Sequence, residues 1–208
     1  MNLILIIILI FFLSCDKKSS SYNIEKLEVA EQMETNYFDN EKMLFSLNAV
    51  QMKKESQNLD LNFEHNFFCV TKNQLYSDKI YEILDSLFSK LSEPVFTEVF
   101  YFSSGVLLDY FENNNELKFN IKSDNAIQYL DKDFIHLKNN VVLSTPNNKS
   151  LHTNNLFWDS SSEIVWTYDS IVVKNLDSVQ GRGCGLFSID NLSSFKTFGV
   201  KGKVNLED

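Results

Sequence analysis

The segment 133–183 constrains the fold of this chain most strongly, because it alternates short apolar runs with turn-forming residues. Asn139-Asn140 and the segment 145–149 supply turn chemistry, and Pro146 cannot donate a hydrogen bond to a central strand ladder. Short strands broken by frequent turns are typical of an antiparallel all-β unit. The strands expected in this segment are 134–138, 141–144, 151–159, 164–166 and 171–173.

Further strands are expected on both sides of this segment. The clearest is 117–123, where Leu117, Phe119 and Ile121 alternate with polar residues, as on a strand with one buried face. The segment 43–49 alternates in the same way. The other expected strands are 66–71, 95–108, 186–189 and 195–204.

Two similar phrases suggest that part of the chain is duplicated. Tyr37-Phe38-Asp39-Asn40 precedes the alternating segment 43–49, and Tyr110-Phe111-Glu112-Asn113 precedes 117–123, with one residue more between phrase and strand. Stacked β-rungs need such a repeated unit, because each rung buries its apolar face only against its neighbours.

One segment has a helical period instead. Its apolar residues Ile80, Ile83, Leu84, Leu87, Phe88 and Leu91 predict an amphipathic helix over about 77–92. Ser77 or Asp78 can cap its start, and Glu93-Pro94 ends it. Two roles stay open for this helix: it plugs an open end of the sheet pair, or it docks on a partner or a membrane surface.

The start of the chain predicts export. Leu3 to Leu13 is an unbroken apolar run, which is too short to span a bilayer but fits a signal-peptide core. Cys15 follows small Ser14, as in a lipoprotein signal, and Asp16 resembles the inner-membrane retention signal of some lipoproteins. The alternative is an ordinary signal peptide or a weak anchor helix, with Cys15 incidental.

The expected organisation is therefore a signal peptide, a tether and one domain. Residues 1–14 are the lipoprotein signal peptide, 15–35 the lipidated cysteine with a flexible lead-in, and 36–204 the β-domain that carries the inserted helix. Hydrophobic residues make up 44% of the chain, including 18 Phe, which is enough for a core. The net charge of −9 argues against nucleic acid as a partner.

No catalytic or metal site is expected. His65, His136 and His152 lie outside any metal-binding spacing, and each is interpreted as a structural histidine. The glycine-rich run 181–185 lacks the Lys-Ser/Thr ending of a phosphate loop, so a corner or bulge in the sheet is expected there. Cys69 and Cys184 form either a disulfide or two buried thiols. We expect no enzyme activity and no cofactor.

The ordered run NNVVLSTPNNKSLHTNNLFWD…SIVVKNLDSVQGRG resembles LptC, the periplasmic component of the lipopolysaccharide export machinery, within the OstA/LptA-like β-jelly-roll superfamily. The family pattern is a G-N-V-x-V strand, an L-x-T-x-x-L-x-W-D strand, a V-x-I strand and a G-x-G corner; Asn139 replaces its first glycine. The resemblance covers residues 94–204. The residues that match are Gly105, Leu151, Thr153, Leu156, Trp158, Asp159, Gly181 and Gly183.

The resemblance implies an open, V-shaped, twisted β-jelly-roll whose apolar groove receives the acyl chains of lipid A. It also implies the LptB-LptF-LptG transporter and the LptA bridge as partners, reached by pairing of edge strands. Burial of ~12 methylenes contributes on the order of 10 kcal/mol, whereas an exposed ion pair contributes ~0.2–1 kcal/mol. An acidic protein should therefore hold lipopolysaccharide by its tails. The groove candidates are Phe45, Leu47, Leu117, Phe119, Ile121, Leu143, Leu156 and Trp158.

Two other functions fit the same residues. An LptA-like soluble bridge would share the fold, although it would not need the anchor at Cys15. A lineage-specific, membrane-anchored lipoprotein that binds a protein partner, such as an inhibitor or immunity factor, would instead have a closed and tightly packed core.

Overall fold

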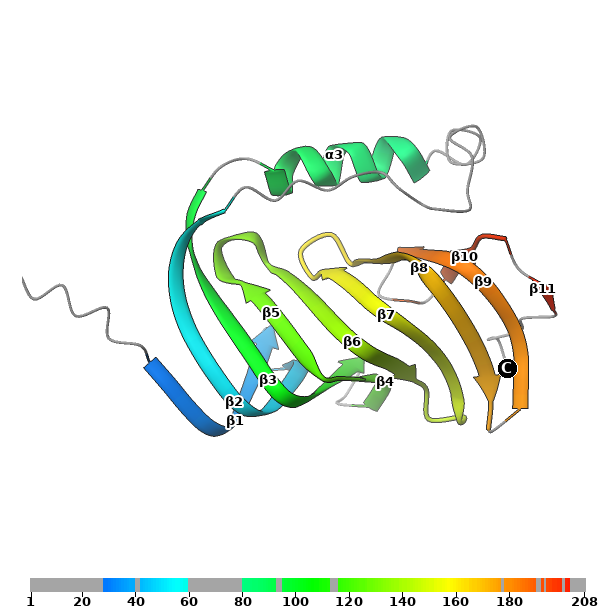
Figure 1. Cartoon of the computed structure of the whole chain (residues 1–208), viewed down its shortest axis with the longest axis horizontal. Coiled ribbons are helices and arrows are strands. Elements are labelled where there is room, and N and C mark those ends of the chain that lie inside the picture. The colour runs from blue at the N-terminus through cyan, green and yellow to red at the C-terminus, as the bar shows by residue number, and fades with distance from the viewer. Residues whose placement is uncertain are drawn as a thin grey trace, which may run out of the picture.

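The computed structural model describes residues 28–39, 42–59, 80–92, 95–112, 116–176, 178–189, 192, 194–199 and 201–202. These form antiparallel β-strands and one α-helix, which confirms the all-β expectation (Figure 1). The elements are β1 (Glu28–Asp39), β2 (Lys42–Leu59), α3 (Ile80–Ser92), β3 (Val95–Glu112), β4 (Glu116–Ser123), β5 (Asn125–Tyr129), the 3₁₀ turn η1 (Leu130–Lys132), β6 (Phe134–Ser144), β7 (Lys149–Asp159), β8 (Ile164–Asn175), β9 (Ser178–Ile189), β10 (Ser194–Thr197) and β11 (Lys201–Gly202).

All the described strands belong to one sheet. The strand order is β1-β2-β3-β4-β6-β7-β8-β9-β10, with β5 between β3 and β6 and β11 paired to β9. β4 pairs with the second half of β3, and β5 pairs with the first half, so the two together act as one strand broken at Asp124. β1 is one edge of the sheet and β10 and β11 lie at the other.

Most strands bend where they cross one line, which we call the crease. Their backbones enter the left-handed region there or shift register, as at a β-bulge. Hydrogen bonds join neighbouring bends: Gly105 N donates to Asp124 O at 3.0 Å, and Asp124 N donates to Asn139 O at 3.0 Å. The bends lie at Gln32, Val50, Ser104–Gly105, Asp124, Asn139–Asn140 and Gly185.

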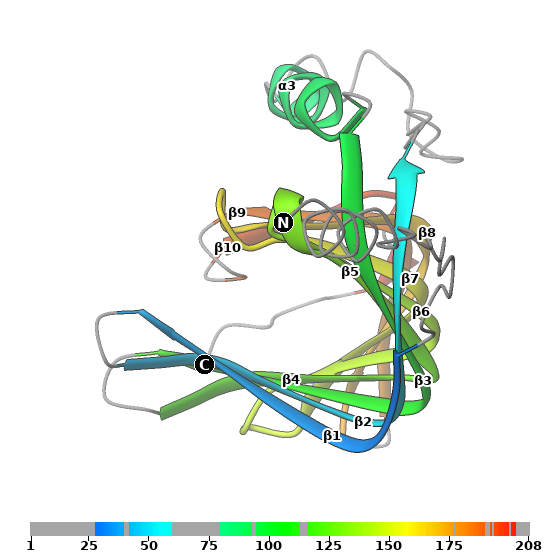
Figure 2. The same cartoon turned by 90° about the vertical axis from the view of Figure 1, so that its left-hand side faces the viewer.

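The crease divides the sheet into two leaves that meet along one side and separate toward the other (Figure 2). The covered leaf contains 51–59, 95–103, β5, 134–138, 156–159, 164–167, 186–189 and β10, and α3 lies on its outer face. The open leaf contains 33–39, 42–49, 106–112, β4, 141–144, 149–153, 170–175, 178–184 and β11. The apolar interior between the leaves is one hydrophobic cluster, and the side chains under α3 form a second.

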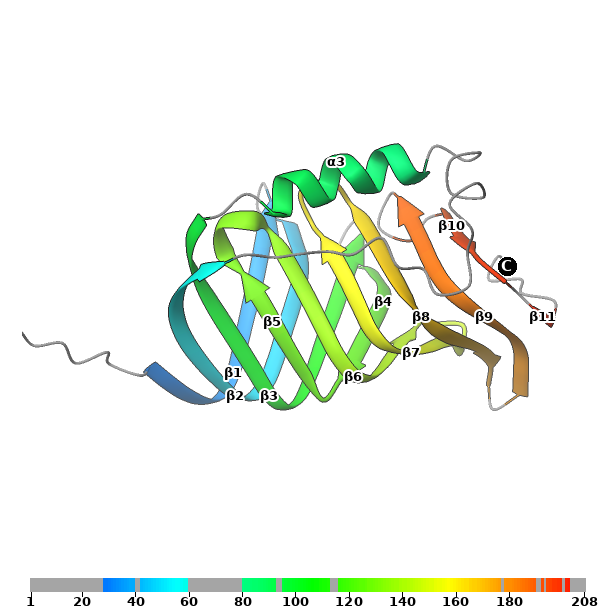
Figure 3. The ribbon, with the colours of Figure 1, turned by 45° about the horizontal axis from the view of Figure 1, so that its top comes forward.

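α3 packs its apolar stripe on the covered leaf (Figure 3). Its buried residues are Ile80, Leu84, Leu87 and Phe88, as the helical period predicts, whereas Ile83 is exposed. Phe88 contacts Trp166 with ring centroids 5.8 Å apart. The helix therefore covers a sheet face and does not plug an open end of the sheet pair.

The structure corrects several expected boundaries. Asn139-Asn140 does not end a strand, because both residues take left-handed conformations (φ 63° and 49°) that bend β6 without reversing it. The expected strands 164–166 and 171–173 are likewise one bent strand, β8. β1 begins at Glu28, so the sheet includes part of the predicted tether 15–35. The expected strand 66–71 lies outside the described residues.

Candidate functional site

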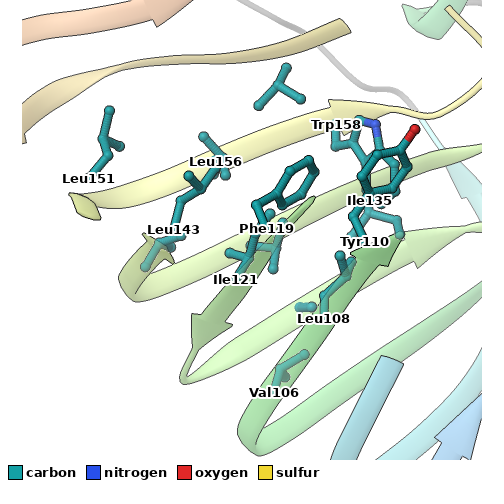
Figure 4. Packing of buried hydrophobic residues seen from close by; sticks show 14 of the residues in the cluster. Val106, Leu108, Tyr110, Phe119, Ile121, Ile135, Leu143, Leu151, Leu156 and Trp158 are labelled. Carbon is teal, nitrogen blue, oxygen red and sulfur yellow. The ribbon is translucent and has the colours of Figure 1, made fainter. Parts of the chain in front are cut away.

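The interior between the leaves holds most of the predicted groove residues (Figure 4). Those in the interior cluster, each at most 8% exposed, are Phe45, Leu47, Phe119, Ile121, Leu143, Leu156 and Trp158. Leu117 is not among them: it pairs with Phe111 beyond a register shift in β3–β4 and is 37% exposed. The side chains of the protein itself thus fill the space around these residues.

Five aromatic rings join the two leaves, and we call them the aromatic clasp: Tyr37, Phe45, Tyr110, Phe119 and Trp158. Tyr37 stacks on Phe45 with centroids 4.0 Å apart, and Tyr110 stacks on Phe119 at 4.8 Å. Trp158, from the covered leaf, meets Phe45 at 5.1 Å and Tyr110 at 5.7 Å, both edge-on. The edge-on contacts of Trp158 have a favoured geometry for aromatic pairs, and they join the covered leaf to the open leaf.

The clasp explains the repeated sequence phrase. Each copy places a tyrosine, Tyr37 or Tyr110, two residues before the end of its strand, and a register shift follows directly after it. Each tyrosine stacks on the phenylalanine opposite, and Phe45 and Tyr110 are themselves cross-strand partners. The duplication is therefore structural, because both copies place a stacked pair in one row across β1–β4.

Polar groups are also enclosed between the leaves. The Gln128 amide, from β5, donates to the Tyr37 hydroxyl of β1 and so bridges the leaves. Burial raises the pKa of Tyr37 above its ordinary value, while this hydrogen bond acts in the opposite direction. Gln128 Oε1 and Thr35 Oγ1 are both buried, and neither has a hydrogen-bond partner among the described residues, so each could accept a further hydrogen bond.

A hollow of about 540 Å³ opens at the crease between β1, β2, β3 and β4. Small residues line it at the bends: Gly105, which has open space where a Cβ would stand, Ala49 and Ser123. Ala49 and Val106, which also line it, belong to the interior cluster. Its polar lining residues include Gln32, Glu34, Asn48 and Lys122.

The family-motif residues of β7 come from both leaves: Leu151 and Thr153 from the open leaf, and Leu156, Trp158 and Asp159 from the covered leaf. Leu151, Leu156 and Trp158 lie in the interior cluster. Asp159 is fully buried, and its Oδ1 accepts hydrogen bonds from Ser161 N at 2.9 Å and Ser162 N at 3.0 Å. Thr153 Oγ1 lies 3.4 Å from Thr167 Oγ1, which links β7 to β8 where the strands bend.

Asp159 also anchors the end of α3. Lys90, in the last turn of the helix, lies 3.6 Å from Asp159 Oδ2 and donates to Ser161 Oγ at 2.9 Å. The buried Lys132 donates to the Lys90 carbonyl oxygen at 2.8 Å, which satisfies one of the free carbonyls of the helix end. The tryptophan-aspartate motif therefore joins the interior, through Trp158, to the helix on the back of the leaf.

The glycine motifs have different roles. Gly105 has φ +100° and forms the bend of β3 at the crease. Gly181 and Gly183 lie inside β9, which has irregularities at the expected corner or bulge: its pairing with β8 shifts register between Val179 and Gly181, and it bends at Gly185. A Cβ at Gly183 would stand 2.8 Å from the Phe198 carbonyl oxygen, and Gly183 is therefore required for close approach of that segment.

The two described histidines, His136 and His152, contact neighbouring side chains of the sheet. His136 stacks on Phe157 at 4.2 Å, and its Nε2 lies 2.9 Å from Asn155 Oδ1. Burial lowers its pKa to about 4, so it is neutral at pH 7. Burial also lowers the pKa of His152, which lies beside Ser150 at 3.1 Å. His65 lies outside the described residues, among which no cluster of three or more His, Cys, Asp or Glu could hold a metal.

Cys184 is half-buried in β9 and is disulfide-bonded. Of the two alternatives for this residue, a disulfide or a buried thiol, the structure has the disulfide. Cys69 and the predicted lipidation site Cys15 both lie outside the described residues.

Sequence reasoning missed several residues of the interior. The cluster also includes Leu108, Leu137 and Val165, which are fully buried. Their strands were expected, but the bends hide which residues share a face. Gln128 and Tyr37 were missed as a bridge because no local pattern links residues so far apart in the chain.

No protein-family profile matches the chain, and no curated protein matches it. Among the described residues, no helix has the length and the apolar character needed to cross a membrane.

Proposed function

We propose that this protein is an LptC-like component of lipopolysaccharide export, anchored through Cys15 to the periplasmic face of the inner membrane. It binds the acyl chains of lipid A between its two leaves and passes them from the LptB-LptF-LptG transporter to the LptA bridge. It is not an enzyme and needs no cofactor. In this proposal the folded sheet is the V-shaped β-jelly-roll of the family.

One observation carries the proposal: a single sheet is folded over a continuous apolar interior, and a hollow at the crease is lined in part by residues of that interior. An acyl chain of ~12 methylenes buried there would contribute on the order of 10 kcal/mol. Such a chain must displace contacts that the leaves make with each other, above all in the aromatic clasp. Lipid binding therefore requires the leaves to separate.

The edges of the sheet support a role between two partners. β1 forms one edge and carries the acidic residues Glu31 and Glu34. The opposite edge carries the basic residue Lys196 on β10. Unpaired edges can add a strand from a partner, and their opposite charges would select different partners. The disulfide at Cys184 is consistent with an oxidising compartment such as the periplasm.

A photo-crosslinking phenylalanine analogue in place of Phe119 tests this function in cells. Phe119 is 2% exposed and lies in the clasp, so its analogue should label lipopolysaccharide only when acyl chains enter the interior. The matched control is the same analogue in place of Phe38, which lies in the other copy of the repeat and is 63% exposed. Labelling of lipopolysaccharide at Phe119 and not at Phe38 is expected. Labelling of protein alone at Phe119 would contradict the proposal.

A second function is favoured by the dense packing of the interior. Leu47, Leu108, Leu137, Leu156 and Val165 are fully buried, as in a closed core. A membrane-anchored lipoprotein that binds a protein partner through its sheet edges would need no groove. In that case the Phe119 analogue would label no lipid, and analogues along β1 would label a protein.

A further inference from the structure

One lysine is buried in the structure without a partner. Lys149, the first residue of β7, is only 7% exposed, and its Nζ has no hydrogen-bond partner among the described residues. No ion pair joins it to any carboxylate of the described residues. Its backbone is well fixed, because its carbonyl oxygen accepts from Thr145 N at 2.9 Å and its Cα pairs with that of Asn175.

Lys149 lies beside the apolar interior. Burial alternates along the start of β7, so Lys149 shares the inward face of the strand with Leu151 and Thr153. Leu151 pairs with Leu143 on one side and Val173 on the other, and all three belong to the interior cluster. An ammonium group therefore stands at the strand end, one step beyond a row of buried aliphatic side chains.

Lys132 is a second buried lysine, and its ammonium group does have a hydrogen-bond acceptor. Lys132 is as deeply buried, at 6% exposed, but it donates to the Lys90 carbonyl oxygen at 2.8 Å. A buried charge without such a partner is costly, because desolvation is not offset by a hydrogen bond or an opposite charge. An anion bound to the Lys149 ammonium group would offset the cost of burying its charge.

We propose that Lys149 binds the anionic head group of an amphiphile, a phosphate or a carboxylate, whose aliphatic tail lies along Leu143, Leu151 and Val173. The inference rests on the proposed function, because it uses the same interior, and it adds the orientation of the ligand: head at the open end of the open leaf, tail toward the crease. The ammonium supplies up to three donors to the head group, and these charge-assisted hydrogen bonds form in a partly dry site.

Calorimetric titration of the purified protein with dodecyl phosphate and with 1-dodecanol tests the inference. The two probes share a tail and differ in charge, so wild-type protein should bind dodecyl phosphate about tenfold or more tightly than 1-dodecanol. Lys149→Met should remove this preference and leave 1-dodecanol binding unchanged. Lys174→Met, on the adjacent strand, is the control of equal charge change and should keep the preference. Lys149→Gln repeats the test with a polar side chain.

The outcomes separate the inference from the proposed function. If both probes bind and Lys149→Met keeps the preference, the head-group site is wrong while the lipid-binding interior stands. If Lys149→Met weakens both probes equally, Lys149 is structural and the inference fails. If inorganic phosphate binds as tightly as dodecyl phosphate, the site takes a free anion and not an amphiphile. If neither probe binds wild-type protein, the proposed function fails as well.

Discussion

Trp158 gives the sharpest test of the packed interior. The side chain is 1% exposed, and its ring makes edge contacts with Phe45 and Tyr110 across the two leaves. Truncation of a buried aromatic side chain to alanine costs about 3–5 kcal/mol, of which each aromatic pair contributes roughly 0.5–1.5 kcal/mol beyond buried area. We therefore expect Trp158→Ala to lower the free energy of unfolding by about 4 kcal/mol, and Trp158→Phe to recover about half of that loss.

Urea denaturation followed by tryptophan fluorescence measures this change. The chain has two tryptophans, so Trp166, buried under α3, is the remaining reporter in Trp158→Ala. Phe38→Ala is the matched control, because Phe38 is 63% exposed and its loss should change stability by less than about 0.5 kcal/mol. If Trp158→Ala lowers the free energy of unfolding as little as Phe38→Ala does, the two leaves are not packed against each other through the aromatic clasp, and the reasoning is refuted.

Three other predictions concern residues outside the clasp. Burial lowers the pKa of His136 from 6.5 to about 4, so the unfolded chain gains a proton first as the pH falls. Stability should therefore be full above pH 6.5 and fall by roughly 3 kcal/mol toward pH 4, and urea titrations should show a smaller fall for His136→Gln. Gly183→Ala would place a Cβ 2.8 Å from the Phe198 carbonyl oxygen, so it should cost about 1–3 kcal/mol and speed hydrogen exchange in β10. Peptide mapping without reductant should recover Cys184 joined to Cys69, and finding a free thiol at Cys184 would contradict the disulfide.

The period-2 pattern predicted much of the interior, because alternation holds between bends. Phe45 with Leu47, and Phe119 with Ile121, do share the buried face. The pattern failed at Leu117, where the register shift after Tyr110 moves the strand end out of the cluster. A single bulge reverses the face of all residues beyond it, and the sequence does not mark where it occurs.

The bend of β6 at Asn139-Asn140 was interpreted as a turn. Asn139-Asn140 has the composition of a reversal, yet tertiary pairing on both sides keeps β6 in the sheet and leaves only a bend. The position of α3 was also beyond the sequence, since its apolar stripe indicates burial without naming the surface that buries it. Lys149 was missed because a lysine beside turn residues is ordinarily solvated, and only the packing shows otherwise.

The crease determines which contacts would break if the two leaves separated to admit a ligand. Several strands continue from one leaf into the other, so a change in the angle between the leaves requires rotation at a few left-handed residues and leaves the backbone ladders on either side paired. Widening the angle would therefore cost side-chain contacts in the interior but few main-chain hydrogen bonds. The crease can therefore act as a hinge: the strands stay paired along it while the two leaves move apart.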